Sequence, residues 1–275
     1  GVECGMGGAV TDWVESQAKG ARYVEVPRGE KREEPIVVAV GAGDVADTGV
    51  MVRAGAEATI VVAAGAGEKD GDAGTSASLV RVIAEAGARV HLHEYVSVGA
   101  TQQHLESVGV SAAQDARVDL GCRYHAAGTE VLDINEVVRQ RGRKTRSELS
   151  YNGVLEDAAH KGLRTTIDLV HGAKGAQGNE AETVLVLGDD VVNKTLPTIL
   201  CDEDDVAGNH GATIGSVSSE QLAFLASRGL SRADAEQLFV RALYEDALMH
   251  APCPEARAIV ENDTKGQSPC IIEEA

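Results

Sequence analysis

The densest group of chemically capable side chains lies in residues 196–213. Cys201, His210 and the four carboxylates of residues 202–205 fall within ten residues of one another. A thiolate and an imidazole are suitable ligands for iron, and carboxylates can complete a labile metal site. A structural interpretation explains the same residues as an inward-facing Cys201, an acidic turn and a His210 held by backbone carbonyls. Taken alone, these residue types favour the structural interpretation.

Two other groups of residues have a simpler explanation than a functional site. His91 and His93 alternate along one strand and share a face, but Glu94 follows immediately and faces the other way, which does not fit a cupin-like metal pair. Two solvent-facing histidines are therefore expected. Residues 139–146 carry five cations in eight residues. They have no aromatic neighbour before Tyr151, so a solvated loop or strand face that pairs with acidic rungs is favoured over a nucleic-acid patch.

Several familiar catalytic motifs are missing from the sequence. There is no G-x-S-x-G, H-E-x-x-H or Walker pattern, so hydrolase, zinc-protease and nucleotide-hydrolysing activities lack their usual support. The glycine-rich stretch Cys4 to Gly8 resembles a phosphate loop only superficially, because it follows no strand and lacks the Gly-Lys-Ser/Thr ending. We therefore do not expect an enzyme of these classes.

Composition limits the partners and the compartment. The 275 residues include 43 acidic and 25 basic side chains, a formal net charge of -18. This charge repels phosphate backbones and anionic membrane surfaces. No apolar run approaches the roughly 20 residues of a membrane span, and five scattered cysteines without a CxxC pair predict reduced thiols. These features are typical of a cytoplasmic protein.

The elements that must position the candidate residues are short strands. From Pro35 to about Ile214, runs of four to eight β-type residues alternate with Gly-Ala or Asp-Ala turn pieces, and Ala88 to Leu92 resembles Ala116 to Leu120. Repetition at roughly 28 to 32 residues is typical of a solenoid. Only 3% of the residues are aromatic, which suits a narrow interior filled by Val, Leu, Ile and Ala. We expect a mainly β protein with a parallel β-helix core.

The hydrophobic period changes after Ile214. Ser218 begins one helix that ends near Gly229, and Ser231 begins a second helix with capping-box spacing. Pro252-Cys253-Pro254 stops the second helix, and the tail beyond it is expected to be partly ordered at best. The predicted organisation is an N-terminal lead-in over 1–34, a β-helix core over 35–215, and a C-terminal helical region and tail over 216–275.

The order and spacing of several motifs resemble the SufB/SufD family of iron-sulfur cluster assembly scaffolds. The resemblance is strong from about Arg146 to Leu243. It is carried by Ser150 to Ala159, Gly172-Ala173, Gly178-Asn179-Glu180, Pro197, Asp204-Asp205-Val206, His210 to Gly215, and Gln221 to Leu230.

The resemblance implies a right-handed parallel β-helix followed by a helical region, in agreement with the pattern of the residues. It also implies a SufC-type ABC ATPase that docks on the helical region, over Ser218 to Met249, and a cysteine desulfurase that supplies sulfur. The iron-sulfur cluster would be transient and assembled between two β-helix subunits, so self-association through 196–214 is expected. His210 matches the histidine implicated there in the SufD type.

The chain departs from both paralogues in its ligand set. Gly208 stands where the SufD type commonly has a cysteine, and Gly211 stands where the SufB type has a glutamate after the histidine. The sulfur-accepting cysteine of the SufB type falls near Glu182, and Cys201 falls on a position that is usually apolar and inward. The chain looks most like the short, single-B minimal systems, in which a homodimer stands in place of two paralogues.

The leading hypothesis is therefore a non-enzymatic scaffold. Its candidate cluster ligands are His210 first, then Glu182, Cys201 and Glu203, with His210 and Cys201 as the metal ligands. The alternative is an adaptor that anchors the ATPase and has no cluster chemistry, which the missing cysteine at position 208 permits. A β-helix enzyme acting on acidic polysaccharide is disfavoured, because it would use cationic clefts and aromatic platforms.

Overall fold

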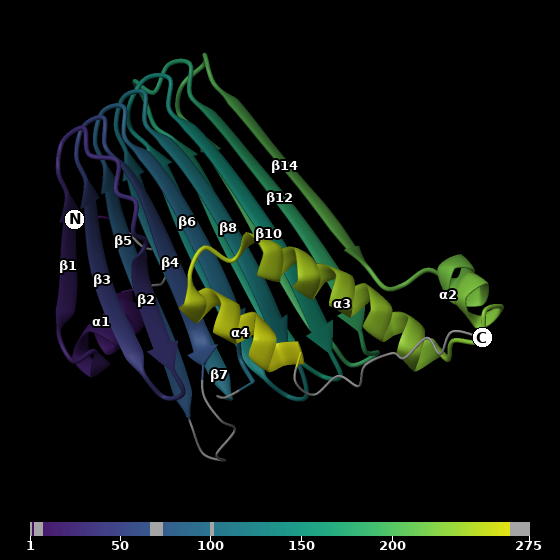
Figure 1. Cartoon of the computed structure of the whole chain (residues 1–275). Coiled ribbons are helices and arrows are strands. Elements are labelled where there is room, and N and C mark those ends of the chain that lie inside the picture. The colour runs from purple at the N-terminus through teal and green to yellow at the C-terminus, as the bar shows by residue number, and fades with distance from the viewer. Residues whose placement is uncertain (1, 3–7, 67–73, 100–101, 265–275) are drawn as a thin grey trace.

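The computed structural model describes residues 2, 8–66, 74–99 and 102–264. Over these residues the chain winds into a parallel β-helix, or solenoid, whose successive strands alternate between two facing seven-stranded sheets (Figure 1). Every strand pairing in both sheets is parallel. The expected β-helix with C-terminal helices is thus confirmed.

The odd-numbered strands form one sheet and the even-numbered strands the other. The odd sheet contains β1 (Ala21–Val26), β3 (Val45–Val52), β5 (Thr75–Ala84), β7 (Gln103–Ala112), β9 (Val131–Gln140), β11 (His160–Leu169) and β13 (Val192–Cys201). The even sheet contains β2 (Ile36–Gly41), β4 (Glu57–Ala66), β6 (Arg89–Ser97), β8 (Arg117–Ala126), β10 (Arg146–Glu156), β12 (Gln177–Leu187) and β14 (Ala207–Gly215). The strand β1 lies within residues 1–34, so the solenoid begins ahead of the domain boundary expected at residue 35.

The interior is filled by alternate residues of each strand. In β8, for example, Val118, Leu120, Cys122 and Tyr124 are buried, while the residues between them are more exposed. Most inward positions carry small or branched aliphatic side chains, and these form one continuous core. Strand alternation therefore explains how a chain with so few aromatic residues fills its interior.

A ladder of turns explains the repeat seen in the sequence. Residues with positive φ occupy the same turn of successive coils and are spaced 28 to 32 residues apart, and each backbone N–H donates to the turn of the next coil. The ladder consists of Gly55, Gly87, Asp115, Lys144 and Gly175. The alanines that follow the first three, Ala56, Ala88 and Ala116, are fully buried at the corner. The same turn geometry is repeated in successive coils and accounts for the recurring Gly-Ala and Asp-Ala pieces.

Four helices complete the described part of the chain. The helix α1 (Gly8–Gln17) packs Val14 against the odd sheet, and α2 (Ser219–Ala226) and α3 (Arg232–His250) begin with the predicted capping boxes at Ser218 and Ser231. The helix α4 (Pro254–Thr264) follows α3. None of these helices combines the length and apolarity that a membrane crossing needs.

The tail after Pro252 is more ordered than the sequence suggested. The sequence did not predict a helix in this tail, but residues 254–264 form α4, which lies on the outer face of the even sheet beside α3 (Figure 1). Ile259 and Val260 of α4 are buried there against Val61 and Tyr95. Pro254 begins this helix, since a proline is well tolerated in the first helical turn. Residues 265–275, with Cys270, lie outside the described residues, as does Cys4 with most of the glycine-rich stretch.

Candidate functional site

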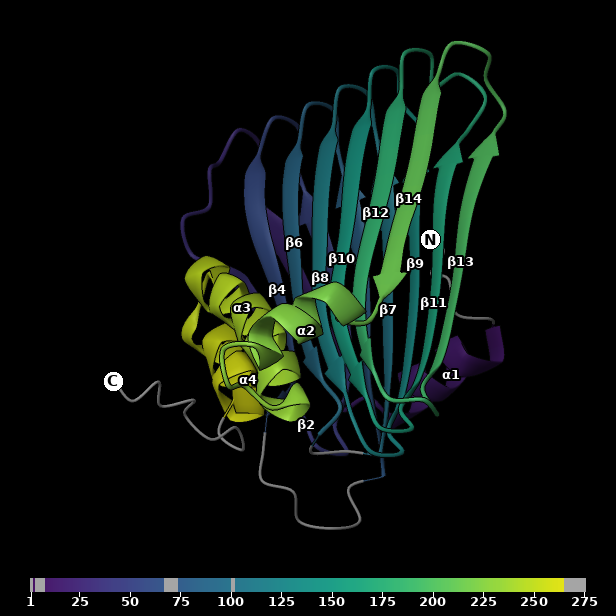
Figure 2. The same cartoon turned by 90° about the vertical axis from the view of Figure 1, so that its right-hand side faces the viewer.

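The last coil of the solenoid leaves two strands at an open edge. Among the described strands, β13 pairs with β11 on one side and β14 pairs with β12 on one side, and neither has a further neighbour (Figure 2). Every residue of β14 is exposed. The candidate residues Cys201 and His210 both lie on these edge strands, so the fold brings the most suggestive sequence segment to the open end.

His210 faces the interior side of this open end. It pairs in register with Glu180 of β12, whose side chain is buried and accepts a hydrogen bond from the Thr165 hydroxyl at 2.6 Å. Burial raises the pKa of Glu180, while Thr165 and the nearby His210 act in the opposite direction. The exposed His210 imidazole thus lies beside the buried carboxyl group of Glu180, whose loss of hydration is only partly offset by its polar neighbours.

Cys201 lies on the corresponding side of β13. It pairs in register with Leu169, which is fully buried, so the thiol belongs to the inward-facing series of its strand. Ile199 of that series lies opposite Gly208, where an added Cβ would come within 2.8 Å of the isoleucine side chain. By the same alternation, His210 lies opposite Pro197, four residues from Cys201. At ~3.3 Å per residue, the two donors are about 13 Å apart along the strand, and one copy of the chain does not bring them to a single point.

Glu203 stabilises the turn between β13 and β14. Its carboxylate accepts hydrogen bonds from the backbone N–H groups of Gly172 and Asp204, each at 3.1 Å. The bond from Gly172 is the main reason why the pKa of Glu203 is lowered. The side chain is therefore committed to the backbone of its own turn and of the preceding coil.

Glu182 lies inside the solenoid, one coil behind the open end. It is 2% exposed, forms an ion pair with the equally buried Lys161, and accepts a hydrogen bond from the Tyr124 hydroxyl at 3.1 Å. Lys161 also donates to Asn193 at 2.8 Å. Burial lowers the pKa of Lys161, and its contact with Glu182 opposes this shift. Glu182 thus serves as the counter-ion of a buried lysine, and its register partner on β14 is Ala212, two residues beyond His210.

A row of polar side chains in the interior was missed by the sequence analysis. Its members occupy inward positions of neighbouring strands and are at most 1% exposed: Glu94, His104, Glu106, Cys122, Glu136 and Tyr151. The signal in the sequence is the alternation of side chains along each strand, because Glu94 shares the inward face of β6 with Val90 and Leu92. Glu94 faces away from His91 and His93, and the same alternation places its side chain in the core.

The remaining sequence candidates lie on outer surfaces. His91 and His93 share the outer face of β6, and His91 contacts Asp119 at 3.1 Å. In the basic stretch, Arg139 forms an ion pair with Asp168 of the next coil at 2.6 Å. Both observations agree with the structural interpretations favoured from the sequence.

The fold and its open end define this protein as a β-helix with an exposed terminal coil that carries an imidazole and a thiol. Residues 114–243 match the family model described as "SUF system FeS cluster assembly, SufBD core domain". Over these residues the chain is similar to the SufBD core domain, and the resemblance of its sequence to the SufB/SufD family is confirmed. The matched region includes β8 to β14, α2 and part of α3, and so contains the open end.

Curated relatives that match this chain are also named as SufD or SufBD family proteins of iron-sulfur cluster assembly. An iron-sulfur cluster assembly protein SufD of Bacillus subtilis is 32% identical over 113 residues, which are 41% of this chain and 26% of that protein. SufD of Escherichia coli is 23% identical over 150 residues, or 54% of this chain and 35% of that protein. A SufBD family protein of Mycobacterium tuberculosis is 26% identical over 297 aligned positions, which cover 92% of this chain and 73% of the relative. The matches to the two SufD proteins thus span about a quarter and a third of their length.

Proposed function

We propose that this chain is a scaffold component of a SUF-type iron-sulfur cluster assembly system and does not catalyse a conventional turnover. The observation that carries the proposal is the match of residues 114–243 to the SufBD core domain, a region that includes the open coil with His210 and Cys201. The cluster is the cargo of such a scaffold, assembled transiently and passed on. A cysteine desulfurase would supply its sulfur, and the protein would act in the cytoplasm.

The separation of the candidate ligands within one copy of the chain supports a cluster site that two chains share. Iron-sulfur clusters are held by several thiolate or imidazole ligands, whereas His210 and Cys201 lie about 13 Å apart along the open coil. His210 is the primary ligand in this proposal, and Cys201 is the second candidate. Glu203 and Glu182 are weaker candidates, because the first holds a turn and the second is paired with Lys161. A second copy, or a paralogue, would complete the ligand set.

The open edge is where that second copy would dock. The strands β13 and β14 leave their backbone groups unpaired on one side, and edges of this kind favour pairing with another chain. We expect a dimer through residues 196–214 in static light scattering at micromolar concentration. A monomer with and without the ATPase would contradict this interface.

The proposed ATPase partner, of the SufC type, would dock on Ser218 to Met249. Phe224 and Leu238 are exposed and line an apolar groove between α2 and α3 together with Leu225 and Phe239. Because α3 also covers the even sheet, a point substitution is a cleaner test than a deletion. Phe224→Asp should abolish co-purification with the ATPase, whereas Arg143→Glu, on an exposed turn at the opposite end of the even strands, should not. Retained binding by Phe224→Asp would place the ATPase elsewhere.

Anaerobic reconstitution with iron and sulfide separates the scaffold from the adaptor that lacks cluster chemistry. The scaffold proposal expects iron-sulfide absorption in the parent protein and its loss in His210→Ala. Cys201→Ser then shows whether the thiol is a ligand or an edge residue. If both variants reconstitute like the parent, the proposal that the cluster assembles on these residues is wrong. If the parent itself takes up no cluster, the adaptor is the better account.

A further inference from the structure

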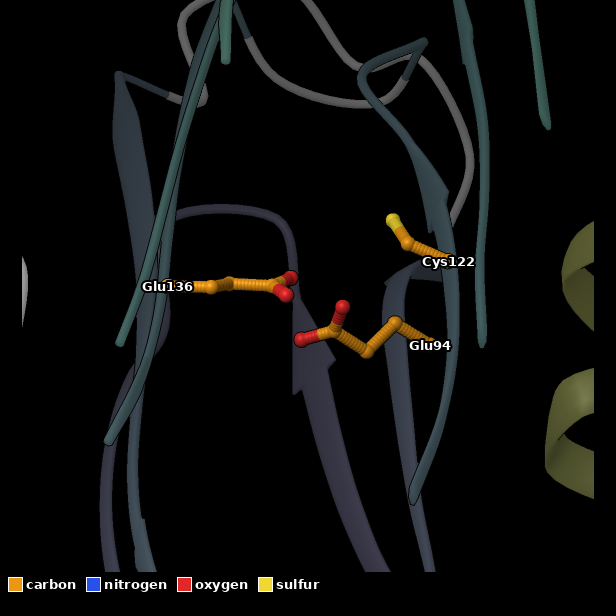
Figure 3. Close-up of side chains that lie close together, drawn as sticks. All are labelled: Glu94, Cys122 and Glu136. Atoms are coloured by element: carbon orange, nitrogen blue, oxygen red, sulfur yellow. The ribbon is translucent and has the colours of Figure 1, made fainter. Parts of the chain in front are cut away.

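Three side chains from both sheets converge in the interior, away from the open end. Glu94 of β6 and Cys122 of β8 are register partners in the even sheet, and Glu136 of β9 reaches toward them from the odd sheet (Figure 3). One ligand atom of each lies within 4.8 Å of the ligand atoms of the other two. Two atoms bound to one ion at 2.0–2.3 Å are at most about 4.5 Å apart. Small side-chain rotations would therefore allow the three groups to share an ion.

The carboxyl groups in this cluster are buried without adequate partners. Glu94, Cys122 and Glu136 are each 0% exposed. With the carboxyl groups ionised, both oxygens of Glu94 and one oxygen of Glu136 have no hydrogen-bond donor among the described residues. Burying polar groups without compensation is costly, and an unexplained instance in a folded protein indicates a missing ligand or a proton. The orphaned oxygens of Glu94 point into the space between the three donors (Figure 3).

The surroundings orient the cluster. Tyr151, the neighbour of Cys122 on β10, donates its hydroxyl hydrogen to the second oxygen of Glu136. A hydrogen bond of this kind fixes a ligating carboxylate and leaves its other oxygen free to bind. The carboxyl group of Glu106 lies close to Glu94, and when it is ionised one of its buried oxygens has no donor among the described residues. Lys161, the buried lysine of the described interior, is paired with Glu182 of β12.

We propose that Glu94, Cys122 and Glu136 bind a divalent first-row transition-metal ion of borderline softness, such as Zn²⁺ or Fe²⁺, inside the solenoid. The thiolate disfavours Mg²⁺ and Ca²⁺, which prefer oxygen ligands alone, and the two carboxylates disfavour Cu⁺. The site is separate from His210 and Cys201 and does not depend on cluster assembly at the open end. The ion would link the two sheets, because its ligands come from both.

The competing explanation is a proton-sharing cluster of neutral carboxyl groups. Burial, with a contribution from Glu106, raises the pKa of Glu94 to about 8. Protonation can therefore satisfy these oxygens in place of a cation. The two explanations differ in what the purified protein binds, and a metal titration separates them.

Co²⁺ is the probe, because its bond to a thiolate gives a charge-transfer band in the near ultraviolet. The full chain is unfolded anaerobically in urea with a chelator, freed of metal, and refolded with or without Co²⁺, since the donors are fully buried. We expect one tightly bound Co²⁺ per chain, the charge-transfer band, and a higher melting temperature that Mg²⁺ does not reproduce. Cys122→Ser should remove the band, and Glu94→Gln should weaken Co²⁺ binding at least about tenfold.

Matched controls locate the ion. Cys253→Ser removes a free thiol between α3 and α4, and Glu148→Gln removes an exposed carboxylate of the even sheet. Both should bind Co²⁺ like the parent. The proposal is overturned if the parent binds no Co²⁺, if the band survives in Cys122→Ser, or if it disappears in Cys253→Ser. Should the core variants fail to fold, X-ray absorption of the loaded parent decides: one sulfur with oxygen ligands supports the site, and any other shell contradicts it.

Discussion

At the scale of single residues, the stability of the interior depends on the pairing of its buried charges. Lys161 and Glu182 are buried together, and removing one partner of such a pair leaves an isolated charge in a medium of low polarity. We predict that Lys161→Met lowers the free energy of unfolding by about 3–5 kcal/mol, measured by urea denaturation. The double variant Lys161→Met/Glu182→Leu should recover most of the loss. Equal stability of the parent and the single variant would show that the pair is not a coupled unit.

His104 makes stability depend on pH in a defined direction. Its imidazole hydrogen-bonds Ser76 at 2.8 Å and contacts Glu106 at 3.1 Å, and burial lowers its pKa to about 4. The ordinary value of about 6.5 holds in the unfolded chain. The contribution of neutral His104 is therefore complete above pH 6.5 and is lost as the pH falls toward 4, by roughly 3 kcal/mol in total.

The variant His104→Gln cannot take up this proton, so its stability should fall less steeply on acidification than that of the parent. Urea denaturation at pH 7.5 and pH 4 measures the difference. The exposed His160→Gln serves as the control and should follow the parent at both values. If His104→Gln and the parent lose the same free energy, the imidazole does not titrate as the buried geometry requires.

The candidate residues were only partly predictable from the sequence. His210 and Cys201 stand in a dense polar segment, and that segment does form the open coil. Glu94, Cys122 and Glu136 are spread over 43 residues of sequence. They meet only because neighbouring strands stack in register and the two sheets face each other. No local spacing rule connects residues that are adjacent through coil stacking.

At the scale of elements, strand periodicity and helix caps could be predicted from the sequence, but the position of α4 on the even sheet could not. Residues 252–254 were expected to stop the second helix, whereas Pro254 begins a further helix whose apolar residues cover the even sheet. Its packing partners, Val61 and Tyr95, are some two hundred and one hundred and sixty residues away in sequence. This contact was therefore invisible to local patterns.

The buried face of α4 gives a direct test of this packing. Ile259 is 2% exposed against the sheet. We predict that Ile259→Ala lowers the free energy of unfolding by about 2–5 kcal/mol, as for other large-to-small core substitutions. Arg257→Ala removes an exposed ion pair with Glu261 and should cost about 0.5 kcal/mol or less. Thermal or urea unfolding measures both, and equal effects would mean that α4 does not pack as described.

At the scale of the whole molecule, the solenoid separates two chemistries. The interior carries buried carboxyl groups and a thiol, while the open coil exposes His210 and Cys201, where we propose that a second chain docks. The turn ladder and the strand pairings hold both regions on one continuous framework. The coil count and the sheet arrangement follow from the repeat, and for that reason the architecture was the part most accessible from sequence.

Cluster assembly between two open coils can be tested by size-exclusion chromatography of the anaerobically reconstituted chain, with light scattering and visible absorption recorded together. We predict that iron-sulfide absorption elutes with the dimer of the parent protein and that His210→Ala loses the absorption while remaining folded. Absorption that elutes with a monomer, or that persists unchanged in His210→Ala, would contradict cluster assembly between two open coils.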